Sequence, residues 1–357
     1  MIASLKVIEL STVLAGPSVG MFFAELGADV LKIEHPSLPD VTRTWKLPAE
    51  APDATVSAYF SSVNYKKRYA RLDLLSEEGR ATIRQLIRDS DLLLMNFKKG
   101  DDSKFGLTTD EISALNPRII IGKITGFGDH SDRVAYDLIL QAETGFMSMN
   151  GTPNSGPVKM PVALIDVLAA HQLKEGLLVA LLDRERTQRG TCVSVSLYDA
   201  AVSSLVNQAS NYLMEQHIPQ RIGSLHPNIA PYGELFTTSD NKLITFAIGS
   251  NTHFRKLCAF LGVPELSQDL RFSENVARVQ HRTELGQLLQ TAIGTYDSAT
   301  LDSHMQELHI PMGIVRSLDE VFSDKAAQAL IREELTEGQP TKRVTTIAFT
   351  AHDYKNA

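Results

Sequence analysis

Residues 5–34 have the sequence LKVIELSTVLAGPSVGMFFAELGADVLKIE, and this stretch decides the fold class. The apolar runs at 5–10 and 29–34 predict two short buried strands. Residues 18–27 between them predict a helix that ends at a glycine. A strand–helix–strand unit predicts two parallel strands joined by a right-handed crossover.

The same alternation continues along the chain. Helices are expected at 76–90 and 108–115, and each precedes an apolar strand, at 91–96 and 118–124. A long helix is expected over about 166–187, because its leucines and valines recur at helical spacing. Strands separated by helices predict an α/β fold with a buried parallel sheet.

The composition of the sequence changes after about residue 220. Residues 223–234 (GSLHPNIAPYGE) are rich in Gly, Pro, His and Asn, which is typical of a linker. We expect a large α/β domain over 1–220, a smaller α+β domain over 226–320, and a segment at 321–357 that returns to the first domain.

Composition and charge disfavour several classes of function. The chain has 357 residues and a formal net charge of −7, which argues against a general nucleic-acid binder. Cys192 and Cys258 form neither a disulfide framework nor a zinc spacing, which fits a reducing, cytoplasmic setting. No apolar run approaches the roughly 18 residues of a membrane-spanning helix. We therefore expect a cytoplasmic protein with no metal site, no nucleic-acid partner and no membrane partner.

The turn STVLAGP at 11–17 precedes the first helix, where free N–H groups and the helix dipole favour a phosphate. The dinucleotide fingerprint G-x-G-x-x-G is absent, since only Gly16 and Gly20 are present. A phosphate-binding turn and an ordinary strand–helix connection both stay open, whereas a nicotinamide site is disfavoured.

A short basic run, NYKKR at 64–68, stands out in this acidic chain. It is either a solvated surface turn or a clamp for phosphates, to which Lys and Arg donate charge-assisted hydrogen bonds. Lys98, Lys99 and Lys104 either extend such a patch or are ordinary surface lysines.

Asp166 ends the apolar run PVALID and begins the long predicted helix. Aspartate is a favoured N-cap residue, so helix capping is one interpretation of this position. The other is chemical, because the helix dipole favours the ionised carboxylate, which is the nucleophilic form. Asp137, after Tyr136, is either a second carboxylate of the site or an exposed loop residue.

Several segments, in order and over almost the whole chain, carry a resemblance to a known family. They are LKVIELSTVLAGPSVGMFFAELGADVLKIEHP, YFSSVNYKKRYARLDL, DLLLMNFKKG with FGL and LNPRIIIGKITGFG, DLILQAETGFMSMNG with PVALIDVLAA, RGTCVSVSLYDAAV and IPMGIV. Together they resemble CoA-transferase family III, the group of formyl-CoA transferase, carnitine CoA-transferase and alpha-methylacyl-CoA racemase.

The resemblance implies a set of site residues. Asp166 would be the covalent nucleophile, with Tyr136 and Asp137 facing the thioester. The residues implied at the coenzyme A site are Val13, Leu14 and Ala15 as lining, Arg43, Lys67 and Arg68 as phosphate ligands, and Asn96, Phe97, Lys104 and Phe105 around the adenine and the pantetheine arm.

The resemblance also implies an activity and an assembly. The family fold is a Rossmann-like large domain with a parallel sheet plus a smaller domain, in an interlocked homodimer. The implied reaction moves CoA from an acyl-CoA thioester to a small carboxylic acid through an aspartyl anhydride and an aspartyl–CoA thioester. Coenzyme A is then a substrate, and no prosthetic group is expected.

Two other functions stay open at this point. One is an acyl-CoA racemase or epimerase, which Tyr136 disfavours because the racemases carry a proton-transferring His there. The other is a CoA-binding protein without catalysis. The loop GSLHPNIAPYG at 223–233 is similar to members that transfer CoA among dicarboxylates and other acyl groups.

Overall fold

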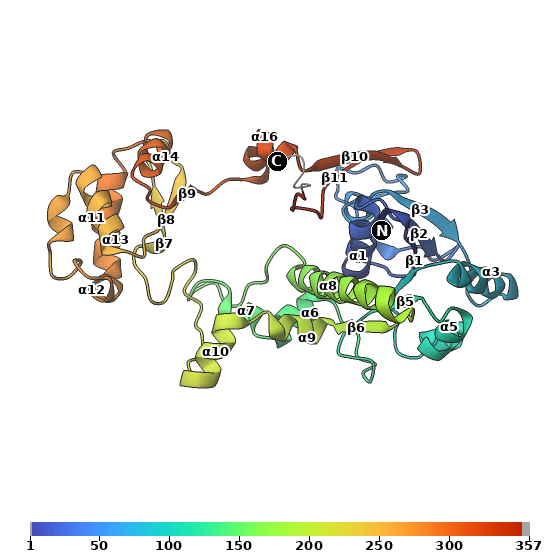
Figure 1. The fold of residues 1–357 in the computed structure, drawn as a ribbon. Coiled ribbons are helices and arrows are strands. Elements are labelled where there is room, and N and C mark those ends of the chain that lie inside the picture. Colours follow the sequence, from blue (N-terminus) through green and yellow to red (C-terminus); the bar gives the residue numbers. More distant parts are fainter. Residues whose placement is uncertain (1, 352–357) are drawn as a thin grey trace. The chain divides into compact units, whose positions relative to one another are not determined.

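A six-stranded parallel sheet organises most of the chain in the computed structural model, which describes residues 2–351 (Figure 1). The strand order is β3-β2-β1-β4-β5-β6 and every neighbouring pair is parallel. The strands are β1 (Lys6–Glu9), β2 (Asp29–Glu34), β3 (Lys67–Arg71), β4 (Leu92–Met95), β5 (Ile120–Thr125) and β6 (Cys192–Ser196). The predicted α/β class with a buried parallel sheet is confirmed.

Helices cover both faces of this sheet, as its buried strands require. The helices of this part are α1 (Ala15–Glu25), α2 (Ala58–Ser61), α3 (Glu77–Arg88), α4 (Asp101–Phe105), α5 (Thr109–Leu115), α6 (Asp137–Glu143), α7 (Phe146–Met149), α8 (Leu164–Thr187), α9 (Leu197–Ser203), α10 (Val206–Glu215) and α16 (Lys325–Gln328), with 3₁₀ turns at η1 (Ile2–Ser4) and η2 (Val41–Thr44). A hairpin of β10 (Ile331–Thr336) and β11 (Gln339–Val344) follows.

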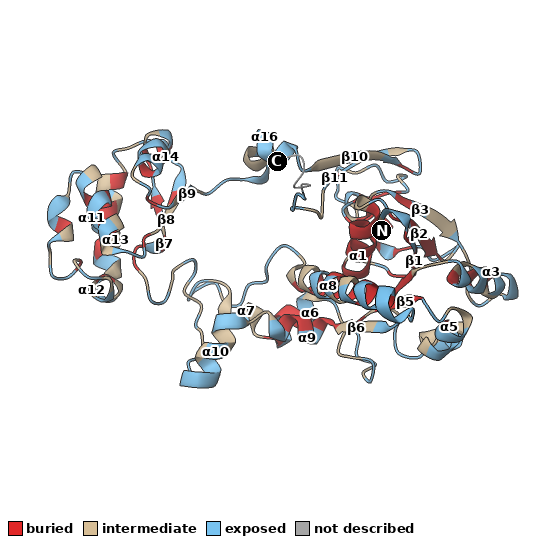
Figure 2. Ribbon diagram, viewed as in Figure 1, coloured by how far each residue is buried: buried red, intermediate tan, exposed pale blue. Residues whose placement is uncertain are grey.

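Strand β4 shows why the sheet is buried on both sides. Leu92 and Leu94 pack with α1 and α8, whereas Leu93 and Met95 pack with α3 and α5 on the opposite face. All four side chains are buried, because neighbouring side chains of a strand point to opposite faces and both faces are covered. Figure 2 shows the same burial along α1, which packs on one of these faces.

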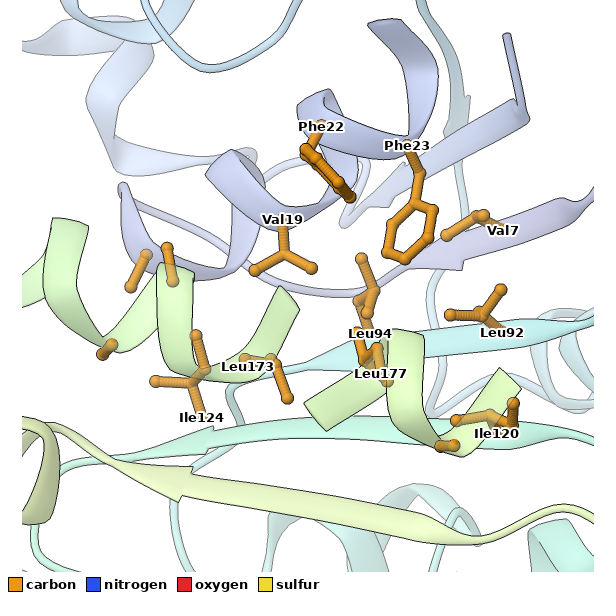
Figure 3. Close-up of a cluster of buried hydrophobic side chains, with 14 of the residues drawn as sticks. Val7, Val19, Phe22, Phe23, Leu92, Leu94, Ile120, Ile124, Leu173 and Leu177 are labelled. Atoms are coloured by element: carbon orange, nitrogen blue, oxygen red, sulfur yellow. The ribbon is translucent and has the colours of Figure 1, made fainter. Parts of the chain in front are cut away.

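The larger core lies between the sheet and the helices α1 and α8 (Figure 3). Val19 and Phe23 of α1 meet Leu173 and Leu177 of α8 over the strands. Gly122 in β5 leaves room for α8, because a Cβ there would lie 3.3 Å from the methyl groups of Leu177. The long helix is therefore held firmly against the sheet, and its first turn is placed by that packing.

Two helix starts differ from the expectation. Helix α1 begins at Ala15 rather than at residue 18, since Pro17 fits within a first turn whose N–H groups have no partner. Helix α8 begins at Leu164, so Asp166 is its third residue and Ala163 is its N-cap. The capping interpretation of Asp166 is therefore wrong, and its carboxylate is available for another role.

The chain forms two compact units by its internal contacts. The first contains the parallel sheet and comprises the described parts of residues 1–148, 158–219 and 326–357; the second comprises 149–157 and 220–325. The elements of the second are β7 (Tyr232–Thr237), β8 (Leu243–Ala247), β9 (Met312–Ile314), α11 (Asn251–Phe260), η3 (Pro264–Ser267), α12 (Asn275–Gln280), α13 (Arg282–Ile293), α14 (Ser298–Glu307) and α15 (Leu318–Phe322). Its three-stranded antiparallel sheet and its helices enclose a core of their own.

Within residues 2–351, no helix is both long enough and apolar enough to cross a lipid bilayer. The same residues contain no group of three or more His, Cys, Asp or Glu side chains placed to hold a metal ion.

Candidate active site

A cavity of about 320 Å³ opens at the carboxyl ends of β1, β4 and β5. Its lining includes Thr12 and Val13 after β1, residues 95–100 at the end of β4 and after it, and residues between 123 and 136 at the end of β5 and in the following loop. The strand order reverses between β1 and β4, because the chain leaves β1 toward β2 and β3 on one side and continues through β5 and β6 on the other. Such a switch point is where open α/β sheets bind their ligands.

The turn after β1 carries three predicted residues, of which Val13 lines this cavity. Val13 lines it with φ of 72°, Leu14 is the N-cap of α1, and Ala15 begins that helix. Beside the turn, the Asn96 side chain accepts from Thr12 N–H at 3.0 Å and donates to the Thr12 carbonyl at 2.9 Å. Val13 and Asn96, implied by the resemblance, are thus neighbours in space.

The remaining residues implied around the pantetheine arm form an aromatic pair near the cavity. Phe97 lines it, and the ring of Phe105 lies 5.2 Å from that of Phe97 in an edge-on arrangement. The Lys104 ammonium lies 5.7 Å from the centre of the Phe105 ring. Phe105 and Lys104 are not part of the cavity lining.

Asp166 is a buried carboxyl with an unusual protonation equilibrium. It is 7% exposed in the first turn of α8. Burial raises the pKa of Asp166 to about 7, and the neighbouring Asp137 carboxylate acts in the same direction. A carboxylate in such an environment is destabilised, which makes it a better nucleophile than an ordinary surface aspartate.

Asp137 joins the two helices of the site. It is the first residue of α6, and its Oδ1 accepts from the backbone N–H of Ile165, next to Asp166, at 2.7 Å. Its Oδ2 accepts from the Gln141 amide at 2.7 Å. Asp137 therefore binds the first turn of α8, the turn that carries Asp166. Tyr136, half exposed, lines the cavity immediately before Asp137, whereas Asp137 and Asp166 lie outside its lining.

Sequence reasoning missed Tyr59, in α2. Burial raises the pKa of the Tyr59 phenol to about 12, and the carboxylates of Asp166 and Asp137 add to the increase, which places Tyr59 in their electrostatic neighbourhood. Its ring also packs edge-on against Trp45 at 5.0 Å. The signal for Tyr59 was in the sequence, because it begins the segment YFSSVNYKKRYARLDL that carries part of the resemblance.

The three cations implied as phosphate ligands have partners within the chain. The Arg43 guanidinium donates to both carboxylate oxygens of Glu34, at 2.9 and 2.7 Å, and also to Glu337 at 2.6 Å. The Lys67 ammonium is buried and pairs with Glu9 at 2.7 Å. Their role as phosphate ligands stays a prediction.

Arg68, the third of these cations, is exposed and pairs with Asp29 at the start of β2. That end of the strands is opposite to the one that carries the cavity. Other cations line the cavity itself: Lys98, Lys99, Lys123 and Arg133. The sequence suggested Lys98 and Lys99, but Lys123 lies within a strand and Arg133 in a loop, where neither position has a distinctive pattern.

The comparisons with known proteins agree with one another. A family model described as "CoA-transferase family III" matches residues 2–353. The chain is 37% identical over 334 residues to succinate–glutarate CoA-transferase of Agrobacterium fabrum, covering 92% of this chain and 83% of that one. It is 34% identical to succinyl-CoA:glutarate CoA-transferase of Mus musculus, over 89% of this chain and 73% of that one.

A solved structure shows the same fold. It is the crystal structure of a CAIB/BAIF family protein from Brucella suis, which superposes with a TM-score of 0.85 and is 35% identical in sequence. The superposition covers 99% of this chain and 93% of the other.

Proposed function

Because this chain belongs to CoA-transferase family III and is an enzyme of that family, we propose that Asp166 is the nucleophile that carries the acyl group and then the CoA. The observation that carries this proposal is the position of Asp166: a buried carboxyl in the first turn of α8, beside a second carboxylate and near a cavity at the switch point of the sheet.

The proposed reaction has four covalent steps. The Asp166 carboxylate attacks the thioester carbonyl, the C–S bond breaks, and CoA thiolate leaves a mixed anhydride. The thiolate attacks the aspartyl carbonyl and releases the donor carboxylate, which gives an aspartyl–CoA thioester. An acceptor carboxylate displaces the thiolate and forms a new anhydride. The thiolate then attacks the acceptor's acyl carbon and regenerates the Asp166 carboxylate.

Each step exchanges one activated acyl group for another, so the cycle needs no nucleotide hydrolysis. The site's electrostatics favour the first step. Ionised Asp166 is disfavoured by burial and by Asp137, and acylation converts it into a neutral group. Because the pKa of Asp166 is about 7, a substantial fraction of its carboxyl is ionised and able to attack near neutral pH.

The cavity is the proposed site for the nucleotide end of CoA. Thr12, Val13, Phe97, Lys98 and Lys123 line it, and the Lys123 ammonium pairs with Asp129 of the same lining at 3.0 Å. Cations there would offset phosphate charge. Tyr136 connects this cavity to Asp137 along the chain, so a pantetheine arm passing Tyr136 leads toward Asp166. Holding CoA by its remote end would keep the thiolate available between steps.

Short dicarboxylates are the proposed acceptor class, because the similar enzymes act, by their names, on succinate and glutarate. A homodimer is also proposed. Its support is helix α10, which buries none of its residues and leaves Val206, Leu213 and Met214 between 69% and 78% exposed. The interlocking of the two chains, the domain bounds 1–220, 226–320 and 321–357, and a cytoplasmic location remain proposals.

An exchange assay tests the function. Succinyl-CoA and glutarate are the substrates, and glutaryl-CoA is measured by mass spectrometry. We expect Asp166→Ala to abolish exchange while free CoA still binds. The matched control is Asp183→Ala, an exposed aspartate on the same helix, which should keep the wild-type rate. Exchange that survives Asp166→Ala would end the proposal. Deuterium entering at the alpha carbon without an acceptor acid would instead support a racemase.

A further inference from the structure

Val13 adopts a backbone conformation that its side chain disfavours. Its φ of 72° lies in the left-handed region, where a β-branched residue is a steric outlier. Such a conformation is strained and persists only when the surrounding structure enforces it. Val13 lines the cavity at the switch point, so the strain lies at the proposed CoA site.

Side chains on the β2 side of the turn enforce this conformation. The Val13 N–H donates to the two carboxylate oxygens of Asp40, at 3.3 and 3.2 Å. The Lys32 ammonium donates to the carbonyl of Ser11 at 2.6 Å and pairs with Asp40 at 3.1 Å. Lys32 and Asp40 are almost fully buried, so their geometry has little freedom.

Asn96 holds the turn from the β4 side, because its amide binds both the N–H and the carbonyl of Thr12. Residues 11–13 are thus fixed by three side chains from three other segments: β2, the loop after β2, and the loop after β4. We name Lys32, Asp40 and Asn96 the turn clamp.

The Asn96 amide has both of its polar ends engaged with Thr12, so its contribution to the cavity is to shape the turn. Asp40 contributes in the same way, through Val13. A preset turn would raise the affinity for CoA, because the apparent dissociation constant equals the intrinsic one divided by the fraction of molecules that already have the required conformation.

Building on the proposed function, we infer that the turn clamp is a positioning device for CoA: Asp40, with Lys32 and Asn96, holds Val13 in the conformation that the CoA site requires. Asp40 touches no substrate in this account. Its removal would therefore weaken CoA binding while leaving the covalent steps at Asp166 intact once CoA is bound.

The test is a double-mutant cycle between Asp40→Asn and Val13→Gly. Glycine adopts positive φ without steric cost, so a glycine turn needs no clamp to reach this conformation. We expect Asp40→Asn to raise the dissociation constant for free CoA, measured by calorimetry, about tenfold, equivalent to about 1.4 kcal/mol. In the Val13→Gly background, the same change should raise it less than about threefold.

Kinetics give a second readout. Asp40→Asn should raise KM for succinyl-CoA by a similar factor and change kcat less than about twofold. The matched control is Asp91→Asn. Asp91 also accepts a backbone N–H, from Lys6 at 2.9 Å, and also pairs with a buried arginine, Arg184 at 3.1 Å, but at the opposite end of the strands. It should lower thermal stability without changing CoA affinity.

Equal effects of Asp40→Asn in the wild-type and Val13→Gly backgrounds would overturn the inference, and so would an unchanged CoA affinity. If Asp40→Asn does not fold, Asp40→Ser carries the same cycle, since Asp40 is the side chain that accepts from the Val13 N–H. A wild-type protein that fails to bind CoA would reject the proposed function itself. If the wild-type protein binds CoA and Asp40→Asn binds it equally well, this inference alone is rejected.

Discussion

Two groups of charged side chains in the sheet unit, one fully buried and one formed by the buried Asp166 and the partly buried Asp137, differ in how their charge is compensated. In the first, the Lys32 ammonium lies 2.9 Å from Glu9 and 3.1 Å from Asp40, and Lys67 pairs with Glu9 at 2.7 Å. In the second, the neighbouring charge that acts on Asp166 is Asp137, of the same sign. The first group stabilises the turn after β1, and the second keeps the Asp166 carboxylate reactive.

Burial alone therefore does not identify a catalytic acid. Asp40 is more deeply buried than Asp166, yet its environment offers hydrogen bonds and an ammonium, so its charge is satisfied. Asp166 is buried with a like charge beside it, which is the arrangement that shifts a pKa toward neutrality. Four substitutions test this contrast.

The largest effect is expected from Lys32→Met. It removes the ammonium that compensates Asp40 and part of the charge of Glu9, so it should lower the free energy of unfolding by about 3–5 kcal/mol. Chemical denaturation monitored by circular dichroism measures the change. A loss under about 1 kcal/mol would show that the ion pairs of Lys32 with Glu9 and Asp40 contribute little to the stability of the fold.

Asp166→Asn should have the opposite sign. The pKa of Asp166 in the folded protein is about 7, above its usual value of 3.8, so its ionisation opposes folding and stability falls as pH rises from about 4 to 7. Replacing it with a neutral amide should stabilise the fold by at most about 4 kcal/mol at pH 8, since one pKa unit corresponds to about 1.4 kcal/mol. The gain should shrink to about half at pH 5.5.

The same denaturation series at the two pH values tests this prediction. Asp183→Asn, an exposed aspartate on the same helix, should change stability by less than about 0.5 kcal/mol at either pH. If Asp166→Asn destabilises the protein at pH 8, the carboxylate is compensated after all and the contrast fails.

A smaller effect is expected from Asp137→Asn. It removes the like charge, so the pKa of Asp166 should fall, by less than burial raises it. The acidic limb of the kcat/KM profile for CoA exchange should move to lower pH by about one unit or less. The rate at the plateau should fall about tenfold, because an amide has one oxygen where Asp137 uses two as acceptors. A shift of the acidic limb to higher pH would contradict the role of Asp137 in raising the pKa of Asp166.

The smallest effect is expected from Lys342→Met, the exposed counterpart of Lys32→Met. Lys342 pairs with Glu333 at 2.6 Å in the β10–β11 hairpin, and both side chains are more than half exposed. Its loss should change the free energy of unfolding by less than about 1 kcal/mol, because solvent and salt screen such pairs. A loss comparable to that of Lys32→Met would mean that burial does not set the strength of these ion pairs.

The regular elements could be predicted because their signals are local. The strand expected at 29–34 is β2 with the same bounds, and the helix expected at 166–187 differs from α8 by two residues at its start. Periodicity is carried by neighbouring residues, so it survives without any knowledge of the fold. The start of α8 has a weaker signal, because no side chain caps it and the sequence offers Asp166 as a cap two residues later.

The candidate site was predictable only where the resemblance supplied it. Asp40 is an ordinary aspartate in the segment LPDVTR, and nothing near it in sequence shows that it binds Val13, 27 residues earlier. The left-handed conformation of Val13 has no sequence signal, since valine predicts extended backbone. Likewise, the pairing of Arg43 with Glu34 and Glu337 depends on contacts formed by folding. Long-range contacts of this kind decide which charges are satisfied and which remain reactive.

The most direct test of the central claim is a trapped covalent intermediate. The protein is mixed with succinyl-CoA without acceptor, quenched with acid within one turnover, digested, and examined by peptide mass spectrometry. We expect the peptide that contains Asp166 to gain the mass of CoA less one water, because the thioester replaces a carboxyl oxygen with the CoA sulfur, and we expect Asp166→Asn to remove this adduct. An adduct on another residue, or full exchange activity without any adduct, would contradict the assignment of Asp166 as the nucleophile.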